Sequence, residues 1–170
     1  MHKTGAQLVR YALEQLSIKH TFGTVGLHNS ELYKALNESD SIIPHLVNQE
    51  LSAAFMADAI SRTSSLGEIG TILINADAMI SQSIAEAFIS GIPLLIIAGG
   101  PLANTPTSGI DQQQLLQPVS KAYFKITQLE DIVGIIFEAQ QIAISDKPGP
   151  VCVEIPIDMQ LHTDDLDKPL

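Results

Sequence analysis

Hydrophobic residues in this chain alternate between two kinds of spacing. Apolar positions at helical spacing predict helices over residues 8–16, 29–36, 49–63, 81–90 and 127–144. Short apolar runs between them predict strands over residues 20–26, 41–47, 69–75, 92–98 and 151–157. Because several runs are apolar at every position, the sheet should be covered on both faces. The pattern predicts an α/β fold, three-layer and Rossmann-like, with a doubly wound, mainly parallel sheet and helices on both faces.

Local signals mark several element boundaries. Thr4 with Gln7, and Thr127 with Glu130, have the spacing of a capping box, in which two side chains satisfy backbone N–H groups at a helix start. Asn29 is a favourable N-cap for the helix that follows it. The strand over residues 41–47 should be irregular or at a sheet edge, because it contains a proline, which cannot donate a ladder hydrogen bond.

The rest of the chain divides into a loop and a tail. Residues 99–118 are rich in Gly, Pro, Thr and Gln, which predicts a long loop of the kind that often carries function. The 170 residues, 45% of them hydrophobic, are enough for one core, so residues 1–160 are expected to form one domain. Residues 161–170 are expected to be an acidic tail or the start of a linker.

Charge and cysteine content narrow the function classes. A net charge of -10 with only nine Lys and Arg residues argues against binding of nucleic acid or an anionic membrane. No apolar run approaches the length needed to span a bilayer. The single cysteine, Cys152, lies in an apolar run and is expected to be a buried small hydrophobe, which fits a reducing cytoplasm.

Several common sites are absent from the sequence. There is no Gly-x-Gly-x-x-Gly motif after the first strand, no Walker phosphate loop and no Gly-x-Ser-x-Gly elbow. The five histidines show no metal-ligand spacing, so no metal site is expected within this chain.

One acidic residue stands out in the stretch "HLVNQELSAAFMADAISR". Glu50 lies where a strand-like run ends and an alanine-rich helix begins. The simplest interpretation is a first-turn carboxylate that interacts favourably with the helix dipole, worth about 0.3–1 kcal/mol. The functional interpretation is a carboxyl group in a tight, partly dry pocket, ready to share a proton with a ring nitrogen. Spacing alone favours the first of these.

Five segments together resemble the N-terminal pyrimidine-binding domain of thiamine diphosphate-dependent enzymes, particularly the acetolactate synthase and 2-oxo acid decarboxylase group. They are "TGAQLVRYALEQL", "FGTVGLHNSELYKAL", "NQELSAAFMADAISR", "DQQQLLQPVSKAYFKIT" and "GPVCVEIPIDM", which follow the family order over nearly the whole chain. The resemblance implies that Glu50 is catalytic: it bonds the pyrimidine nitrogen of the cofactor and favours the tautomer that activates the thiazolium carbon.

The same resemblance implies further site residues. The family turn Phe-Gly-x-Pro-Gly corresponds to "FGTVG", so Thr24, Val25 and Gly26 are candidate cofactor contacts beside Glu50, although Gly26 could equally be a plain turn glycine. Lys121 matches a family lysine on the substrate side, although a surface lysine is at least as consistent with its position.

The chain also departs from the family pattern. "INADAMISQ" replaces a Gly- and Pro-containing loop that borders the cofactor, and Thr107, Ser108 and Gly109 replace Phe-Gln-Glu on the substrate side. Nothing matches the Gly-Asp-Gly motif and downstream Asn that hold the diphosphate and Mg²⁺ in family members. The resemblance therefore implies thiamine diphosphate as cofactor, with Mg²⁺ held by a partner domain outside this chain, either in cis or as a second subunit.

The predicted function is the pyrimidine-binding part of an acetolactate synthase-like enzyme. It would decarboxylate a 2-oxo acid, with or without acyl transfer, as a homo-oligomer such as a dimer, and the isolated chain would be inactive. Within the same fold, the alternatives are the alpha subunit of a sulfopyruvate or phosphonopyruvate decarboxylase-like enzyme and a catalytically degenerate interaction module. A further alternative is an unrelated Rossmann-like protein that binds a small molecule without a partner.

Overall fold

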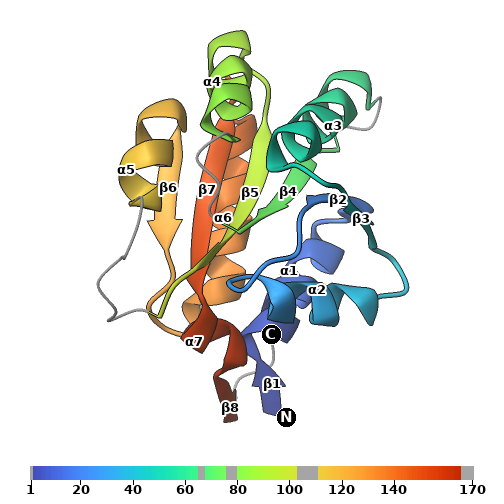
Figure 1. The fold of residues 1–170 in the computed structure, drawn as a ribbon, viewed down its shortest axis with the longest axis vertical. Helices are drawn as coiled ribbons and strands as arrows, with labels where there is room; N and C mark the ends of the chain where they lie inside the picture. The colour runs from blue at the N-terminus through green and yellow to red at the C-terminus, as the bar shows by residue number, and fades with distance from the viewer. Residues whose placement is uncertain (1, 65–67, 76–79, 103–110, 166–170) are drawn as a thin grey trace.

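The computed structural model describes residues 2–64, 68–75, 80–102 and 111–165. Six strands form one sheet in which every neighbouring pair is parallel (Figure 1). Their spatial order is β3 (Ile43–Leu46), β2 (His20–Gly23), β4 (Gly70–Ile74), β5 (Leu94–Gly100), β7 (Pro150–Pro156) and β6 (Ala122–Lys125). The predicted doubly wound α/β fold is confirmed, and this sheet is wholly rather than mainly parallel.

Helices cover both faces of the sheet. One face carries α1 (Gly5–Gln15), α2 (Ser30–Asn37) and α6 (Asp131–Ile144). The other carries α3 (Glu50–Thr63), α4 (Ile80–Ser90), α5 (Gln112–Leu116) and the short 3₁₀ helix η1 (Gln117–Val119). Neighbouring residues of a central strand enter different cores, as Ile72 and Leu73 do, because successive strand side chains point to opposite faces.

The path of the chain reverses beside β2. From β2 it passes through α2 to β3 at one edge, and it then returns through α3, on the opposite face, to β4 on the other side of β2. The carboxyl ends of β2 and β4 are therefore neighbours, with Gly23 paired to Leu73. In open parallel sheets, ligands bind outside the strand ends at such a reversal point.

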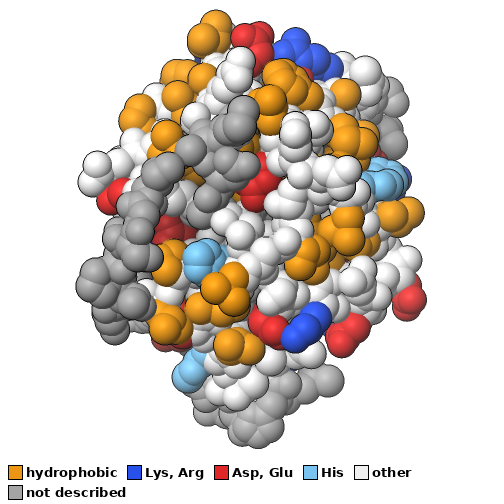
Figure 2. Space-filling model, in the orientation of Figure 1, with side chains coloured by type: hydrophobic (Ala, Val, Ile, Leu, Met, Phe, Trp, Pro, Cys, Tyr) orange, Lys and Arg blue, Asp and Glu red, His pale blue; other side chains and the backbone are white. Residues whose placement is uncertain are grey.

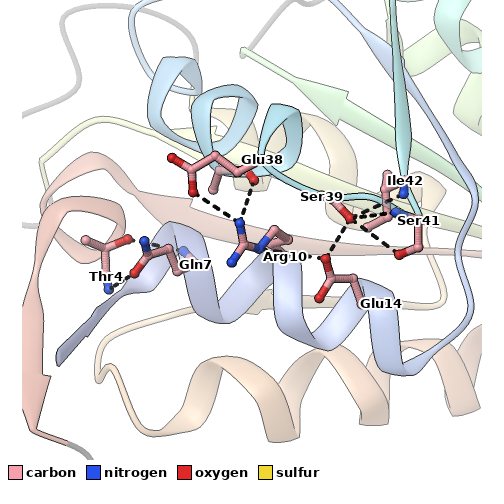
Figure 3. Close-up of polar contacts among 9 residues, drawn as sticks. Thr4, Gln7, Arg10, Glu14, Glu38, Ser39, Ser41 and Ile42 are labelled. Carbon is pink, nitrogen blue, oxygen red and sulfur yellow. Dashed lines mark hydrogen bonds and ion pairs between the residues drawn. The ribbon is translucent and has the colours of Figure 1, made fainter. Parts of the chain in front are cut away.

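Polar contacts along α1 confirm the first predicted capping box (Figure 3). Thr4 Oγ1 accepts from the Gln7 backbone N at 3.2 Å, and Gln7 Oε1 accepts from the Thr4 backbone N at 3.1 Å. Further along the helix, Arg10 Nη1 donates to Glu38 Oε2 at 3.1 Å. This bond ties α1 to the end of α2, although a partly exposed ion pair of this kind contributes at most about 1 kcal/mol.

The second predicted capping box is wrong. Helix α6 begins at Asp131 with Glu130 as its N-cap, and no side chain among the described residues caps it. The preceding turn is instead anchored by the buried side chains of Ile126 and Leu129. The Thr-x-x-Glu spacing alone did not locate the helix start. The position of the turn, and so of the first helical residue, depends instead on the burial of Ile126 and Leu129.

The region after β5 contains more regular structure than predicted. Residues 103–110 of the predicted loop lie outside the described residues, but α5 and η1 occupy much of the rest. Asp111 caps α5, with its Oδ1 accepting from the Gln114 backbone N at 3.2 Å. The loop prediction is therefore wrong for its second half.

Strand β6, at the sheet edge, was not predicted at all. It has only four residues, and three of them are partly rather than fully buried, so its apolar signal is weak. Two side chains fasten it to β7 through the buried Glu154: the Tyr123 hydroxyl donates to Glu154, and Lys125 Nζ lies 2.9 Å from its Oε1. Burial, the nearby Cys152 thiol and Glu154 raise the pKa of Tyr123, so the phenol remains a donor. Cys152 is fully buried, as predicted.

The two ends of the described chain meet in a second, smaller sheet. After β7 the chain forms α7 (Ile157–Leu161) and then β8 (Thr163–Asp165), which pairs antiparallel with β1 (His2–Thr4). Part of the segment predicted as an acidic tail is thus paired in a strand. None of the described helices has both the length and the apolar character needed to cross a bilayer.

Candidate functional site

Glu50 is the first residue of α3, and its side chain is only 2% exposed. Among the described residues, its Oε1 accepts from the Asn75 backbone N at 2.5 Å and from Thr24 Oγ1 at 3.1 Å. Asn75 directly follows β4, and Thr24 directly follows β2. The carboxyl group therefore lies at the reversal point of the sheet, between the two strand ends where this fold places ligands.

A buried asparagine shapes the loop that follows β2. Asn29 is fully buried; its Oδ1 accepts from the Gly26 backbone N at 2.7 Å, and its Nδ2 donates to the Thr24 carbonyl at 2.8 Å. Asn29 occupies the N-cap position of α2, as predicted, but its side chain makes no capping bond within the described chain. Its amide instead holds the Thr24–Gly26 turn in place.

The loop lies directly on the neighbouring strand ends. Asn75 Oδ1 accepts from the His28 backbone N at 2.6 Å. A Cβ atom at Gly26 would lie 2.1 Å from the Asn75 amide nitrogen, and one at Gly99 would lie 2.1 Å from the His28 carbonyl oxygen. Gly99 requires glycine because it meets backbone, whereas a larger residue at Gly26 would displace the Asn75 side chain. Gly26 thus has a packing role, while Val25, at the turn, is 53% exposed.

Asn29→Ala is expected to lower the free energy of unfolding by about 2 kcal/mol, because it removes the bonding partners of one backbone N–H and one carbonyl group in a buried turn. The measurement is chemical denaturation of the full chain. Asn37→Ala, an exposed position at the end of the same helix, is the control and should change stability by less than about 0.5 kcal/mol. Equal effects of the two substitutions would show that Asn29 does not hold the loop.

Two polar groups near this loop have no hydrogen-bond partner among the described residues. They are the Tyr33 hydroxyl and His28 Nδ1, both buried. Burial, and secondarily the neighbouring Glu50, raise the pKa of Tyr33, so the phenol stays protonated. Tyr33 lies beneath the strand end, since a Cβ atom at Gly23 would be 2.5 Å from its hydroxyl. The sequence pattern did not mark Tyr33, because an aromatic residue at helical spacing is typical of a hydrophobic core.

Lys121 is not close to Glu50. It precedes β6 and so lies at the amino-terminal edge of the sheet, whereas Glu50 lies at the carboxyl edge. Its Nζ donates to the carbonyl oxygens of Ile142 at 2.5 Å and Ser145 at 2.7 Å, at the end of α6. Lys121 therefore caps a helix in this chain, and its predicted substrate-side role stays a prediction that this geometry does not favour.

Lys121→Met is expected to lower the free energy of unfolding by about 1–2 kcal/mol, since it removes a cation that neutralises the last carbonyls of α6. Thermal or denaturant unfolding measures the change. Lys34→Met is the comparison, because its exposed ion pair with Glu31 should contribute less than about 0.5 kcal/mol. A stable variant with an altered substrate KM would instead support the substrate-side role.

A groove away from Glu50 is a weaker candidate for a functional site. A groove of about 170 Å³ lies at the amino-terminal edge of the sheet, between the end of α1 and the start of β4. An ion pair between Lys19 and Glu68 crosses it at 3.4 Å, and its lining residues do not include Glu50. Nowhere in the described ranges do three His, Cys, Asp or Glu side chains gather as metal ligands.

Comparison with known proteins identifies the family. The chain is 32% identical over 165 residues to the acetolactate synthase isozyme 3 large subunit of Escherichia coli K12, a match that covers 92% of this chain and 28% of the relative. It is 28% identical over 174 residues to the acetolactate synthase large subunit of Lactococcus lactis, a match that covers 98% of this chain and 30% of the relative. It is 27% identical over 165 residues to the chloroplastic acetolactate synthase 2 of Zea mays, a match that covers 93% of this chain and 26% of the relative. The chain thus spans less than a third of the length of these relatives. The family model described as "Thiamine pyrophosphate enzyme, N-terminal TPP binding domain" matches residues 3–121, and the chain therefore belongs to this family.

Proposed function

We propose that this chain supplies the pyrimidine-binding half of the active site of an acetolactate synthase-like enzyme that depends on thiamine diphosphate. The observation that carries the proposal is the buried Glu50 carboxyl group, held by the Asn75 N–H and the Thr24 hydroxyl between the ends of β2 and β4. The similarity to acetolactate synthases supports it. The alternative of a first-turn carboxylate explains neither the burial nor the bond across to β4.

The residues of this site fit an aminopyrimidine ring. Glu50 would exchange a proton with a ring nitrogen, and the two donors to its Oε1 hold the carboxyl group in one orientation while it does so. Thr24, Val25 and Gly26 would lie along the ring, on a turn that Asn29 keeps rigid. When bound, thiamine diphosphate supplies a carbon nucleophile and an electron sink for 2-oxo acids.

The same residues do not suit the diphosphate. The side chains that shape the loop and hold Glu50 belong to Thr24, Asn29 and Asn75 and are all neutral. An anionic diphosphate and its Mg²⁺ need oxygen ligands and positive charge, so we assign them to a further domain, in cis or as a second subunit. Figure 2 agrees, since Lys and Arg side chains are sparse on the face it shows.

The complete enzyme would decarboxylate a 2-oxo acid in the cytoplasm, with or without transfer of the acyl group to a second carbonyl compound. Its site would form between the pyrimidine-binding and diphosphate-binding parts, so the chain alone would be inactive. Assembly as a homo-oligomer, such as a dimer, would bring two such sites together. The altered segment after β4 also contributes Asn75 to the site, although residues 76–79, like residues 107–109, lie outside the described residues.

The test is purification of the protein from its source cells with any partner it retains, followed by calorimetric titration with thiamine diphosphate and Mg²⁺. We expect binding by the complex, no binding by the 170-residue chain alone, and turnover of a 2-oxo acid by the complex. A complex that carries a diphosphate-binding domain but binds no cofactor would overturn the proposal and favour an interaction module. Decarboxylation without acyl transfer by two separate chains would instead indicate a sulfopyruvate or phosphonopyruvate decarboxylase-like enzyme.

A further inference from the structure

Two histidines meet where β2 and β3 pair. His20 Nδ1 lies 3.0 Å from His45 Nε2, and the two ring centroids are 5.1 Å apart with an angle of 39° between the ring planes. His20 begins β2 and His45 lies in the edge strand β3, so 25 residues separate them in sequence. Neither takes part in the hydrogen bonds that hold Glu50 or shape the Thr24–Asn29 loop.

The backbone and one aromatic contact hold this histidine pair in place. Strands β2 and β3 are paired in parallel, with His20 opposite Ile43 and Phe22 opposite His45. The His45 ring stacks on Phe22, with centroids 4.9 Å apart and planes inclined by 15°. Both histidines are partly buried rather than enclosed, so solvent reaches them. The two nitrogens are therefore fixed near each other at an accessible edge of the sheet.

The separation of the two nitrogens suits a metal ion. A hydrogen bond between two imidazole nitrogens means that at least one of them presents a lone pair, and neutral imidazole is a good ligand for first-row transition metals. With metal–nitrogen bonds of about 2.0–2.1 Å, nitrogens 3.0 Å apart subtend roughly 95° at the ion. This is close to the right angle between neighbouring ligands in tetragonal Ni²⁺ or Cu²⁺ sites, and smaller than the tetrahedral angle of Zn²⁺ sites.

We propose that His20 and His45 together bind one divalent transition-metal ion of the Ni²⁺ or Cu²⁺ class, in place of the proton that they share. For both lone pairs to point to the ion, each ring must turn by roughly 45° from the line that joins the two nitrogens. The described residues offer no third His, Cys, Asp or Glu ligand, so water completes the coordination. The pair uses side chains of β2 and β3, whereas the proposed cofactor site uses residues that follow β2 and β4.

The proposal is tested by calorimetric titration of the full chain with Ni²⁺ in the absence of cofactor. We expect one ion per chain, and an affinity that falls about tenfold or more in His20→Gln and, separately, in His45→Gln. His162→Gln, an exposed position, is the matched control and should leave the affinity unchanged. Mg²⁺, which prefers oxygen ligands, should not bind to this pair.

A second measurement does not depend on the variants. Paramagnetic Ni²⁺ should broaden the imidazole NMR signals of His20 and His45 in the wild-type chain before those of His28 and His162. The proposal is overturned if these two signals stay sharp, or if the affinity is unchanged in both correctly folded Gln variants. It is also overturned if binding is lost only in His2→Gln, which would place the ion at the start of the chain.

Discussion

Glu50→Gln in the assembled enzyme is expected to lower kcat by about 10²–10⁴-fold, the range that a positioned proton-transfer group contributes. Glutamine has the shape of glutamate, and its carbonyl oxygen can accept from the Asn75 N–H and the Thr24 hydroxyl in place of Oε1. It cannot exchange a proton with a ring nitrogen. The variant should therefore fold like the wild type and lose turnover, which steady-state kinetics with a 2-oxo acid and denaturant unfolding would measure together.

Asp131→Asn is the matched control for this loss of activity. Asp131 is also a first-turn carboxylate, at the start of α6, but it is exposed and lies on the opposite face of the sheet. Its substitution should cost up to about 1 kcal/mol of stability and leave kcat unchanged. If Glu50→Gln likewise altered only stability, Glu50 would have no role beyond its interaction with the helix dipole.

Gly70→Ala is expected to lower the free energy of unfolding by about 3 kcal/mol or more, because the new methyl group overlaps backbone that cannot move independently. A Cβ atom at Gly70 would lie 1.9 Å from the Ala57 carbonyl oxygen and 2.5 Å from its carbonyl carbon. Ala57 is in the middle of α3, the helix that begins with Glu50. To relieve the overlap, α3 must shift away from β4, and cofactor affinity should fall together with stability.

Gly134→Ala is expected to raise the free energy of unfolding, the opposite of the effect expected for Gly70→Ala. Gly134 is exposed in the interior of α6, and no atom lies within 4 Å of the Cβ that alanine would add. Alanine should therefore raise the free energy of unfolding by about 0.5–1 kcal/mol, through its higher helix propensity. Urea denaturation of both variants measures these free energies. Equal free energies of unfolding for Gly70→Ala and Gly134→Ala would contradict the close contact between β4 and α3.

The strongest apolar runs predicted their elements well. Residues 69–75, 92–98 and 151–157 form the central strands β4, β5 and β7, which are buried along their whole length. The edge strand β6 and the small β1–β8 sheet gave no such signal. Short strands that are exposed on one side need few apolar residues, so their pairing is decided by the partners that they meet.

The candidate site residues also divide into those that the sequence marked and those that it did not. Glu50 and Thr24 were predicted from a family resemblance, and the structure brings them within hydrogen-bonding distance, 26 residues apart in sequence. Asn75 was noted only as part of an altered segment, yet its backbone N–H and its side chain both bond to the site. No local pattern marks such a residue, because its role depends on which strand end lies next to it.

The sequence by itself determined the alternation of strands and helices, the buried position of Cys152 and the choice of Glu50, since burial periodicity and motif order are local properties of the chain. Only the tertiary structure decided the strand order β3-β2-β4-β5-β7-β6, and with it every contact between segments distant in sequence. That order places Asn75 against Glu50, moves Lys121 to the opposite edge of the sheet, and brings His20 to His45. The physical reason is that parallel strands are joined by crossovers, so spatial neighbours are fixed by packing of the helices on the two faces and not by adjacency in the chain.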